Sequence, residues 1–252
     1  MTMKKIMQRI CSIIICLTVV SCSGIVSAFA VDDAESAYAV KTVYGHTYKY
    51  ASVIERWNSS QLAARTYVGV TSGKSVPIGY IGTKAKLYST SGVLVASAGW
   101  SYNIVACWGH SAPVYHKTSE TPKYTYYYSK GQVQLYNGSG YTTYNCYASP
   151  NMSSTVSSNI ISVQRNSDGE IFGSEIFLNS IGVEPDLILA LGTNGIEGYV
   201  RSADLDREYV PKNPTDALMH QEQAHEIPLY AEDGKSVLGS FAIQKNESDS
   251  SL

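Results

Sequence analysis

The sequence predicts a mainly β protein, with an N-terminal tyrosine-rich antiparallel β-sandwich followed by a small α+β part made of β-hairpins and short helices. Three observations predict this. Short runs rich in Tyr, Val and Thr alternate between apolar and polar residues and are separated by turns containing Gly and Asn. Before residue 165, no apolar stripe with helical spacing exceeds two turns. Beyond it, hairpins are interspersed with short segments that carry helix start and stop residues.

Three hairpins account for most of the N-terminal part. The segments TYKYASVIE and AARTYVGVT flank RWNSSQ, which is a plausible turn. AKLYSTSGVLVASAGWSYN breaks at Ser91-Gly92, and QVQLYNGSGYTTYNCY breaks at NGSG, where Asn and Gly tolerate the positive φ of tight turns. The last two segments share the frame L-Y-x-x-S-G at an offset of 48 residues, so we expect two similar hairpins in one sandwich.

The C-terminal part contains two hairpins and two helix signals. GSEIFLNSIG predicts a short helix with Ser174 as N-cap and Gly182 as a left-handed stop. NPTDALMHQEQAH predicts a second helix, from about Pro214 to His225. The hairpins turn at Asn194-Gly195 and at Asp233-Gly234.

Charge divides the chain at residues 165–170. Residues 41–165 hold eleven Lys and Arg against Glu55 and Glu120 alone, whereas the rest of the chain beyond them holds five basic and sixteen acidic residues. So abrupt a reversal predicts a domain boundary. The predicted organisation is a basic Tyr-rich β-domain, an acidic α+β domain and a disordered tail, at residues 31–165, 166–243 and 244–252.

Residues 1–30 carry the features of a secretory signal peptide. MTMKKIMQR is basic, ICSIIICLTVV is apolar but short, and Ala28 and Ala30 form a small-residue cleavage site. The sequence therefore predicts secretion. The alternative is a membrane-anchored lipoprotein, because VVSC loosely matches a lipobox in which Cys22 would be lipidated.

Cys107 and Cys146 remain after cleavage of the signal peptide, and we expect them to form a disulfide. Two free buried thiols are the alternative. Cys107 also lies beside His110 and His116 in CWGHSAPVYH, but three ligands fall short of a structural zinc site, and no orienting acid accompanies a Cys–His nucleophile. We predict no metal and no cofactor. The chain also has no serine-hydrolase elbow, phosphate loop, dinucleotide fingerprint or H-E-x-x-H motif, so we do not expect an enzyme.

Four runs carry a resemblance to other proteins. YGHTYKY, GYIGTKAKLYSTSGVLVAS, YYSKGQVQLYNGSGYTTY and GVEPDLILALGTNGIEGYVRSADL resemble uncharacterised secreted proteins of Gram-positive bacteria. The resemblance covers most of the chain beyond residue 30 and implies a compartment and a bacterial source, but no activity. GIEGYVRSADL alone also resembles the closing hairpin of small bacterial Src-homology-like barrels.

The segment KYTYYYSK supplies the predicted binding residues. On a strand, its alternating tyrosines would share one face, flanked by lysines, and phenols on such a face can stack on sugars or sit at a membrane–water interface. The predicted contact residues are Lys123, Tyr124, Tyr126, Tyr128 and Lys130. The alternative is that most of these tyrosines are half-buried residues of ordinary β structure.

These features together predict a secreted, non-enzymatic protein that binds an anionic partner through its basic β-domain. The partner would be a cell-wall polymer, an acidic glycan or membrane headgroups, and secretion argues against nucleic acid as a biological partner. A bacteriocin-like or pore-forming protein is one alternative. An enzyme built on Cys107 and His110 is the other.

Overall fold

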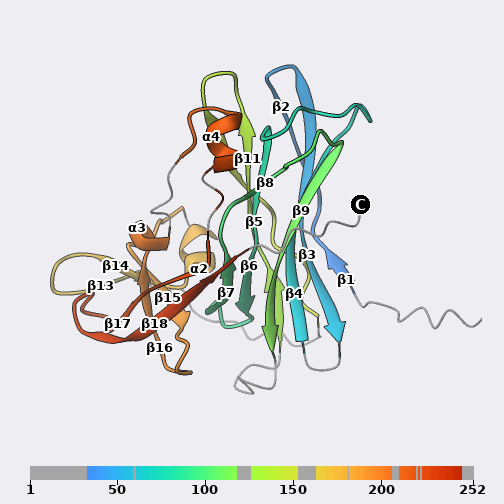
Figure 1. Cartoon of the computed structure of the whole chain (residues 1–252). Coiled ribbons are helices and arrows are strands. Elements are labelled where there is room, and N and C mark those ends of the chain that lie inside the picture. The colour runs from blue at the N-terminus through green and yellow to red at the C-terminus, as the bar shows by residue number, and fades with distance from the viewer. Residues whose placement is uncertain are drawn as a thin grey trace, which may run out of the picture. The chain divides into compact units, whose positions relative to one another are not determined.

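A long hairpin forms the centre of the first sheet. The structure is a computed structural model that describes residues 33–58, 61–117, 126–152, 163–180, 182–205, 210–219, 221 and 223–245 (Figure 1). β3 (His46–Asn58) pairs antiparallel with β4 (Gln61–Val70), which confirms the hairpin predicted around RWNSSQ. Three further strands pair with this hairpin, namely β1 (Asp33–Glu35) and β2 (Ala39–Val43) on β3, and β9 (Gly109–Lys117) on β4.

A second sheet packs on the first and completes a sandwich. Its four strands are β12 (Tyr141–Asn145), β11 (Gln132–Tyr136), β5 (Ile81–Lys84) and β8 (Ser101–Tyr102), in that order. Because side chains alternate along a strand, one face of each sheet is apolar and turns inward. Tyr48, Tyr50 and Val68 of the first sheet meet Ile81, Val133 and Leu135 of the second in one buried cluster.

The third sheet has nine strands and joins the two halves of the sequence. In order they are β10 (Tyr127–Ser129), β6 (Lys86–Ser89), β7 (Leu94–Ala98), β18 (Val237–Gln244), β17 (His225–Tyr230), β16 (Glu197–Arg201), β15 (Leu187–Leu191), β14 (Ile171–Gly173) and β13 (Gln164–Arg165). An additional pairing of β7 with β15 closes a ring through β18, β17 and β16. A buried cluster takes side chains from all five strands of this ring, including Leu94, Ile188, Val200, Leu229 and Phe241.

The remaining predicted hairpins are also present. β6–β7, β11–β12, β15–β16 and β17–β18 are antiparallel pairs. Their turns contain glycines with positive φ, at Gly92, Gly138, Gly195 and Gly234. The prediction of a mainly β chain with antiparallel sheets and few short helices is therefore confirmed.

Three short helices lie in the C-terminal part of the described chain. α2 (Glu175–Ser180) follows Ser174, and Gly182 beyond it has φ +74° as predicted. α3 (Ser202–Leu205) continues directly from β16. α4 (Pro214–Met219) is shorter than predicted, because its last expected residue, His225, instead opens β17 opposite Ile243. Asn213 caps α4, accepting a hydrogen bond from Asp216 N at 3.0 Å.

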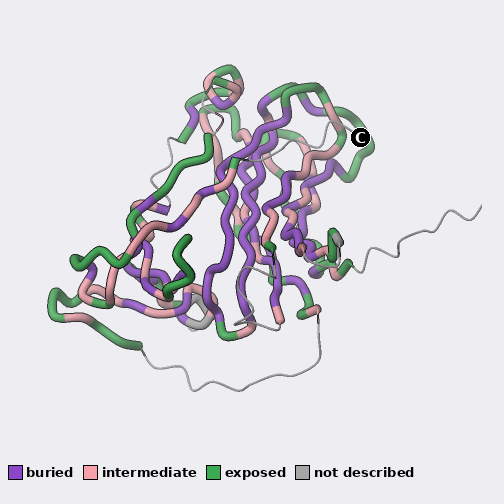
Figure 2. The backbone as a smooth tube through the Cα atoms, turned by 60° about the horizontal axis from the view of Figure 1, so that its bottom comes forward, coloured by how far each residue is buried: buried purple, intermediate pink, exposed green. Residues whose placement is uncertain are grey.

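The predicted boundary at residues 165–170 lies within the nine-stranded sheet, because β7 on its basic side pairs with β15 and β18 on its acidic side. The described residues, from 33 to 245, belong to one compact unit. Opposite charges meet at this junction: Lys86 Nζ lies 3.5 Å from a carboxylate oxygen of Glu175. Figure 2 shows buried strands running through the centre and exposed loops at their ends.

Candidate functional site

The structure places the predicted tyrosine face partly in the core. Lys123 and Tyr124 lie outside the described residues, and Tyr126 is half-buried. Tyr128 is 6% exposed, and its ring stacks on Tyr88 with centroids 5.6 Å apart and an interplanar angle of 14°. Tyr128 therefore faces the core and not a partner.

The burial of Tyr128 has a simple cause in the position of β10. The strand is shorter than the predicted row of tyrosines, because β10 begins only at Tyr127, and its two faces are both covered. The Tyr127 side chain packs in the buried cluster beneath the first sheet, and the Tyr128 side chain packs in the buried cluster of the closed ring of strands. Successive rings thus enter two different cores, which the alternation alone does not reveal.

The predicted contact residue Lys130 belongs to a buried charged cluster. Burial lowers the pKa of Lys130, with Glu175 opposing and Lys86 reinforcing that shift. Tyr88 donates a hydrogen bond to the same Glu175 oxygen that lies near Lys86. Burial acts to raise the pKa of Glu175, but the lysine charges and this hydrogen bond outweigh it, so the net shift is downward. This cluster connects the basic and acidic parts of the chain.

Tyrosines gather instead at one end of the sandwich, where the β2–β3 turn, the β4–β5 loop and the β11–β12 hairpin meet. Neighbouring ring centroids are 4.9–5.7 Å apart along the series Tyr80–Tyr136–Tyr141–Tyr102, and Tyr44 lies 5.5 Å from Tyr136. Such edge and tilted contacts stabilise aromatic clusters. Tyr102 is buried, the other three residues of the series are half-buried, and Tyr44 is exposed at the surface.

Tyr44 holds an unusual backbone conformation. Its φ is +48°, the only positive value of a non-glycine residue in the described chain, and Gly45 follows at +76°. A turn of this kind favours Asn or Gly at both positions. The Tyr44 ring packs over Gly138, where an added Cβ would lie 2.6 Å from a ring carbon. The Tyr44 ring is therefore placed by a strained backbone conformation and by the absence of a side chain at Gly138.

Large hydrophobic side chains are exposed around the tyrosine cluster. They come from the β2–β3 turn, the β4–β5 loop, the β8–β9 loop and α4, which Figure 1 shows at the same end of the sandwich. We call this set the apolar end, and its members are 45–73% exposed: Tyr44, Ile78, Ile104, Val105, Trp108 and Met219. Exposed apolar residues grouped in this way mark interaction surfaces.

The β8–β9 loop is held in place by one buried side chain. The Asn103 amide donates to Pro77 O at 3.0 Å and to Val105 O at 2.8 Å, and its oxygen accepts from Ile81 N at 2.9 Å. Its backbone carbonyl accepts from Gly79 N at 2.8 Å. The outward direction of Ile104 and Val105 is therefore fixed by the fold. Sequence analysis missed both residues, although an apolar pair directly after a buried strand end is a usable signal.

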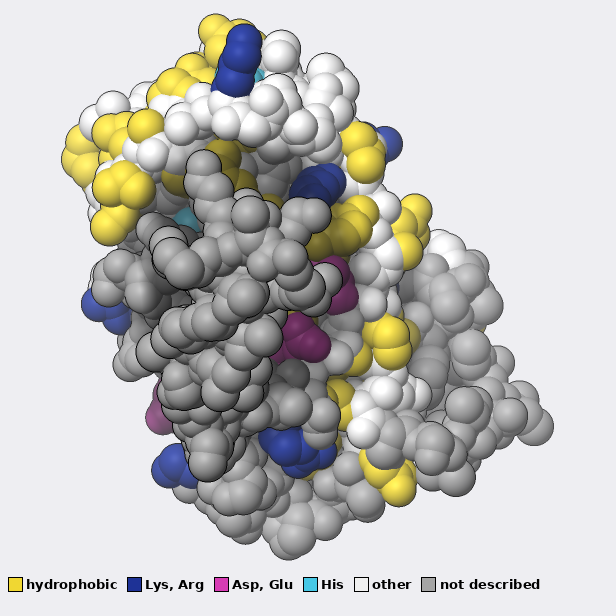
Figure 3. Space-filling model, turned by 90° about the vertical axis from the view of Figure 1, so that its right-hand side faces the viewer, with side chains coloured by type: hydrophobic (Ala, Val, Ile, Leu, Met, Phe, Trp, Pro, Cys, Tyr) yellow, Lys and Arg dark blue, Asp and Glu magenta, His cyan; other side chains and the backbone are white. Residues whose placement is uncertain are grey.

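The charge at the apolar end is weakly positive. The loops that form it expose Lys74 and Lys212, and their only described carboxylate is Asp216, which accepts from Lys212 N at 2.9 Å. Figure 3 shows hydrophobic and basic side chains at the upper end of the view, whereas the Asp and Glu side chains visible in this view lie in its middle and lower parts. This surface thus combines a weakly positive charge with exposed apolar side chains.

The two cysteines do not form the predicted disulfide and are free thiols. Both belong to the cluster between the two sheets, but different neighbours fix their backbones. The backbone of Cys107 forms an antiparallel β-bridge with that of Val76, whereas Cys146 N donates a hydrogen bond to Gly131 O at 2.9 Å. Burial raises the pKa of both thiols, that of Cys146 to about 12. Neither is an activated nucleophile.

The two histidines near Cys107 do not join it in a site. Burial lowers the pKa of His110 to about 4, and its ring nitrogen lies 3.0 Å from Ser101 O. The ring of His116 lies 5.4 Å from that of Tyr127. Among the described residues, no group of three or more His, Cys, Asp or Glu side chains could hold a metal ion.

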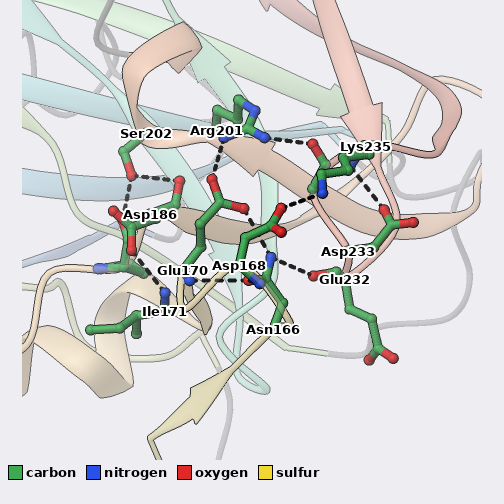
Figure 4. A network of polar contacts seen from close by, with 12 residues as sticks. Asn166, Asp168, Glu170, Ile171, Asp186, Arg201, Ser202, Glu232, Asp233 and Lys235 are labelled. Carbon is green, nitrogen blue, oxygen red and sulfur yellow. Dashed lines mark hydrogen bonds and ion pairs between the residues drawn. The ribbon is translucent and has the colours of Figure 1, made fainter.

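A polar groove of about 460 Å³ lies where the sandwich meets the ring, and its lining is acidic. Much of that lining is already engaged in a network that fixes turns (Figure 4). Arg201 lies 2.6 Å from Glu170, and Asp186 accepts from Ile171 N at 2.8 Å. Hydrogen bonds from Asn166 and Arg201 lower the pKa of Glu170. These contacts engage Glu170, Asp186 and Arg201 of the lining.

Comparison with known proteins gives no match: no protein-family model, curated protein or solved structure is similar to the chain. Within the part of the chain that the structure describes, none of the helices is both long and apolar enough to span a membrane.

Proposed function

We propose that the chain is a secreted, non-enzymatic protein that binds an anionic surface of the cell envelope through the apolar end. The observation that carries the proposal is the combination at one end of the sandwich of exposed aromatic and aliphatic side chains with Lys74 and Lys212. Phenol and indole rings suit a surface that is partly wet and partly apolar. Lysines draw such a protein to negative charge.

Secretion is part of this proposal and rests on the N-terminal segment. The basic start, the short apolar run and the small residues Ala28 and Ala30 are those of a cleaved signal peptide. A cell-envelope partner is then the first anionic surface that the protein meets.

A binding role is supported by the state of the reactive groups. The thiols of Cys107 and Cys146 have raised pKa values, and the polar side chains lining the groove are largely paired with one another. Catalytic groups are usually poised with one partner left open for substrate.

Sedimentation with isolated cell walls and with vesicles of anionic phosphatidylglycerol tests the proposal. We expect binding to one of these surfaces to fall steeply as salt rises, because screening shortens the range of the attraction. Lys74→Glu should weaken binding at least about fivefold. Lys245→Glu, an exposed lysine outside the apolar end, is the matched control. Binding that ignores salt, or equal losses in the two variants, contradicts the proposal.

A further inference from the structure

We propose that the partner of the apolar end is an anionic lipid bilayer and that the β8–β9 loop penetrates it. The inference rests on the proposed function and deepens it, because it selects lipid over wall polymer. Three observations carry it: the chemistry of the exposed side chains, the rigidity of their loop, and the strained turn beside them.

The chemistry separates the two surfaces. A polyanionic glycan is bound by cations, by hydrogen bonds and by rings that stack on sugars, and an exposed aliphatic side chain gains nothing from it. Ile104 and Val105 are 59% and 62% exposed, and Ile78 lies beside them. Their apolar surface leaves water only when it meets another apolar phase. An acyl-chain region supplies that phase, and the lysines account for a preference for anionic headgroups.

The rigidity of the loop shows that the exposure is part of the fold. Asn103 is 2% exposed and makes five hydrogen bonds with neighbouring backbone groups, and the backbone of Cys107 forms a β-bridge with Val76 at the other end of the loop. A loop that is already ordered in this way loses little conformational entropy on binding. Ile104 and Val105 are therefore presented in the position in which they would enter a membrane.

The strained turn adds an aromatic ring on the same side. Tyr44 keeps φ +48° although Asn would fit there with less strain. Strain of this kind concentrates at functional positions. With Trp108, which is 56% exposed, Tyr44 would place amphipathic rings at the interface between headgroups and acyl chains.

Trp108 provides a direct probe of penetration. Trp100 is 4% exposed, and Trp57, which is 49% exposed, lies near the far end of β3. Trp57 lies eleven positions along β3 from His46, which is beside the β2–β3 turn, and this corresponds to about 35 Å at the rise of an extended chain. In the Trp57→Phe variant the remaining exposed indole is Trp108, so its fluorescence reports on the apolar end. In the Trp108→Phe variant the remaining exposed indole is Trp57, which reports on the opposite end.

Vesicles of phosphatidylglycerol with brominated acyl chains test the proposal, because bromine quenches only indoles that reach the chains. We expect strong quenching in Trp57→Phe and almost none in Trp108→Phe. The double variant Ile104→Asp/Val105→Asp should bind these vesicles roughly thirtyfold or more weakly, since two exposed aliphatic side chains no longer gain from burial. Val237→Asp/Leu238→Asp, at positions 63% and 39% exposed on β18, is the matched control and should stay within about twofold of the unsubstituted chain.

The outcomes separate this inference from the proposed function. Salt-dependent vesicle binding without quenching of Trp108 overturns penetration and leaves electrostatic binding in place. Sedimentation with walls but not with vesicles identifies a wall polymer and overturns the choice of lipid. The absence of binding to either surface overturns both proposals.

Discussion

Replacing Glu175 by Gln should destabilise the protein by about 3–4 kcal/mol, because a buried charged pair joins the two parts of the chain. Lys86 is 2% exposed, and its Nζ lies 3.5 Å from the Glu175 carboxylate, which also accepts a hydrogen bond from Tyr88. The substitution preserves the shape of the side chain but removes its charge. The buried ammonium of Lys86 then loses this counter-charge, while Lys130 remains nearby.

The magnitude follows from the geometry. At 3.5 Å and an effective dielectric constant of about 20, the attraction between the two charges is about 5 kcal/mol. The amide oxygen of Gln keeps part of the hydrogen bonding, so the observed loss should be somewhat smaller. In other proteins, removing one member of a buried ion pair typically costs roughly 3–5 kcal/mol of stability.

Urea unfolding of Glu175→Gln, Lys86→Met and the double variant measures this energy and its origin. We expect the double variant to lose at least about 2 kcal/mol less than the sum of the single variants, because the second substitution removes the buried ammonium that has lost the charge of Glu175. A loss below about 1 kcal/mol in Glu175→Gln, or additive losses, would refute the account of the junction.

Three further predictions follow from the same contacts. Because the native pKa of Glu175 is lowered, its stabilising charge is present above its unfolded pKa of about 4.3 and is lost as pH falls through the native value, so urea midpoints should drop there in the parent but less in Glu175→Gln. Cys107 and Cys146 should react slowly with iodoacetamide at pH 7.5 until urea is added; rapid alkylation of Cys107 would instead favour the Cys–His enzyme hypothesis. Tyr44→Asn should relieve about 1 kcal/mol of backbone strain while weakening vesicle binding, and a variant that binds as tightly as the parent would remove Tyr44 from the binding surface.

Local turn chemistry made the hairpins predictable from sequence. Asn194-Gly195 and Asp233-Gly234 each specify a tight turn within a few residues, and both hairpins form as expected. The prediction that the second helix extends to His225 was wrong. His225 instead pairs with Ile243, on a strand that lies further along the chain and that local sequence patterns do not reveal. Closure of the ring through β7 and β15 is non-local in the same way.

The candidate site was harder to predict than the fold. The sequence pointed to alternating tyrosines around Tyr128, but burial on both sides of β10 depends on two cores that only the tertiary structure defines. Ile104 and Val105 were not among the residues that the sequence indicated. Their position directly after a strand end is a signal that they could be exposed, but their exposure is fixed by the hydrogen bonds of Asn103, which composition and periodicity do not reveal.

Hydrogen exchange of the full chain with and without anionic phosphatidylglycerol vesicles tests most directly which surface binds. We expect vesicles to slow exchange in peptides covering residues 43–48, 71–80 and 101–108, and to leave residues 225–244 of the ring unchanged. Protection confined to the ring, or to the turn beside Trp57, would contradict the assignment of binding to the apolar end.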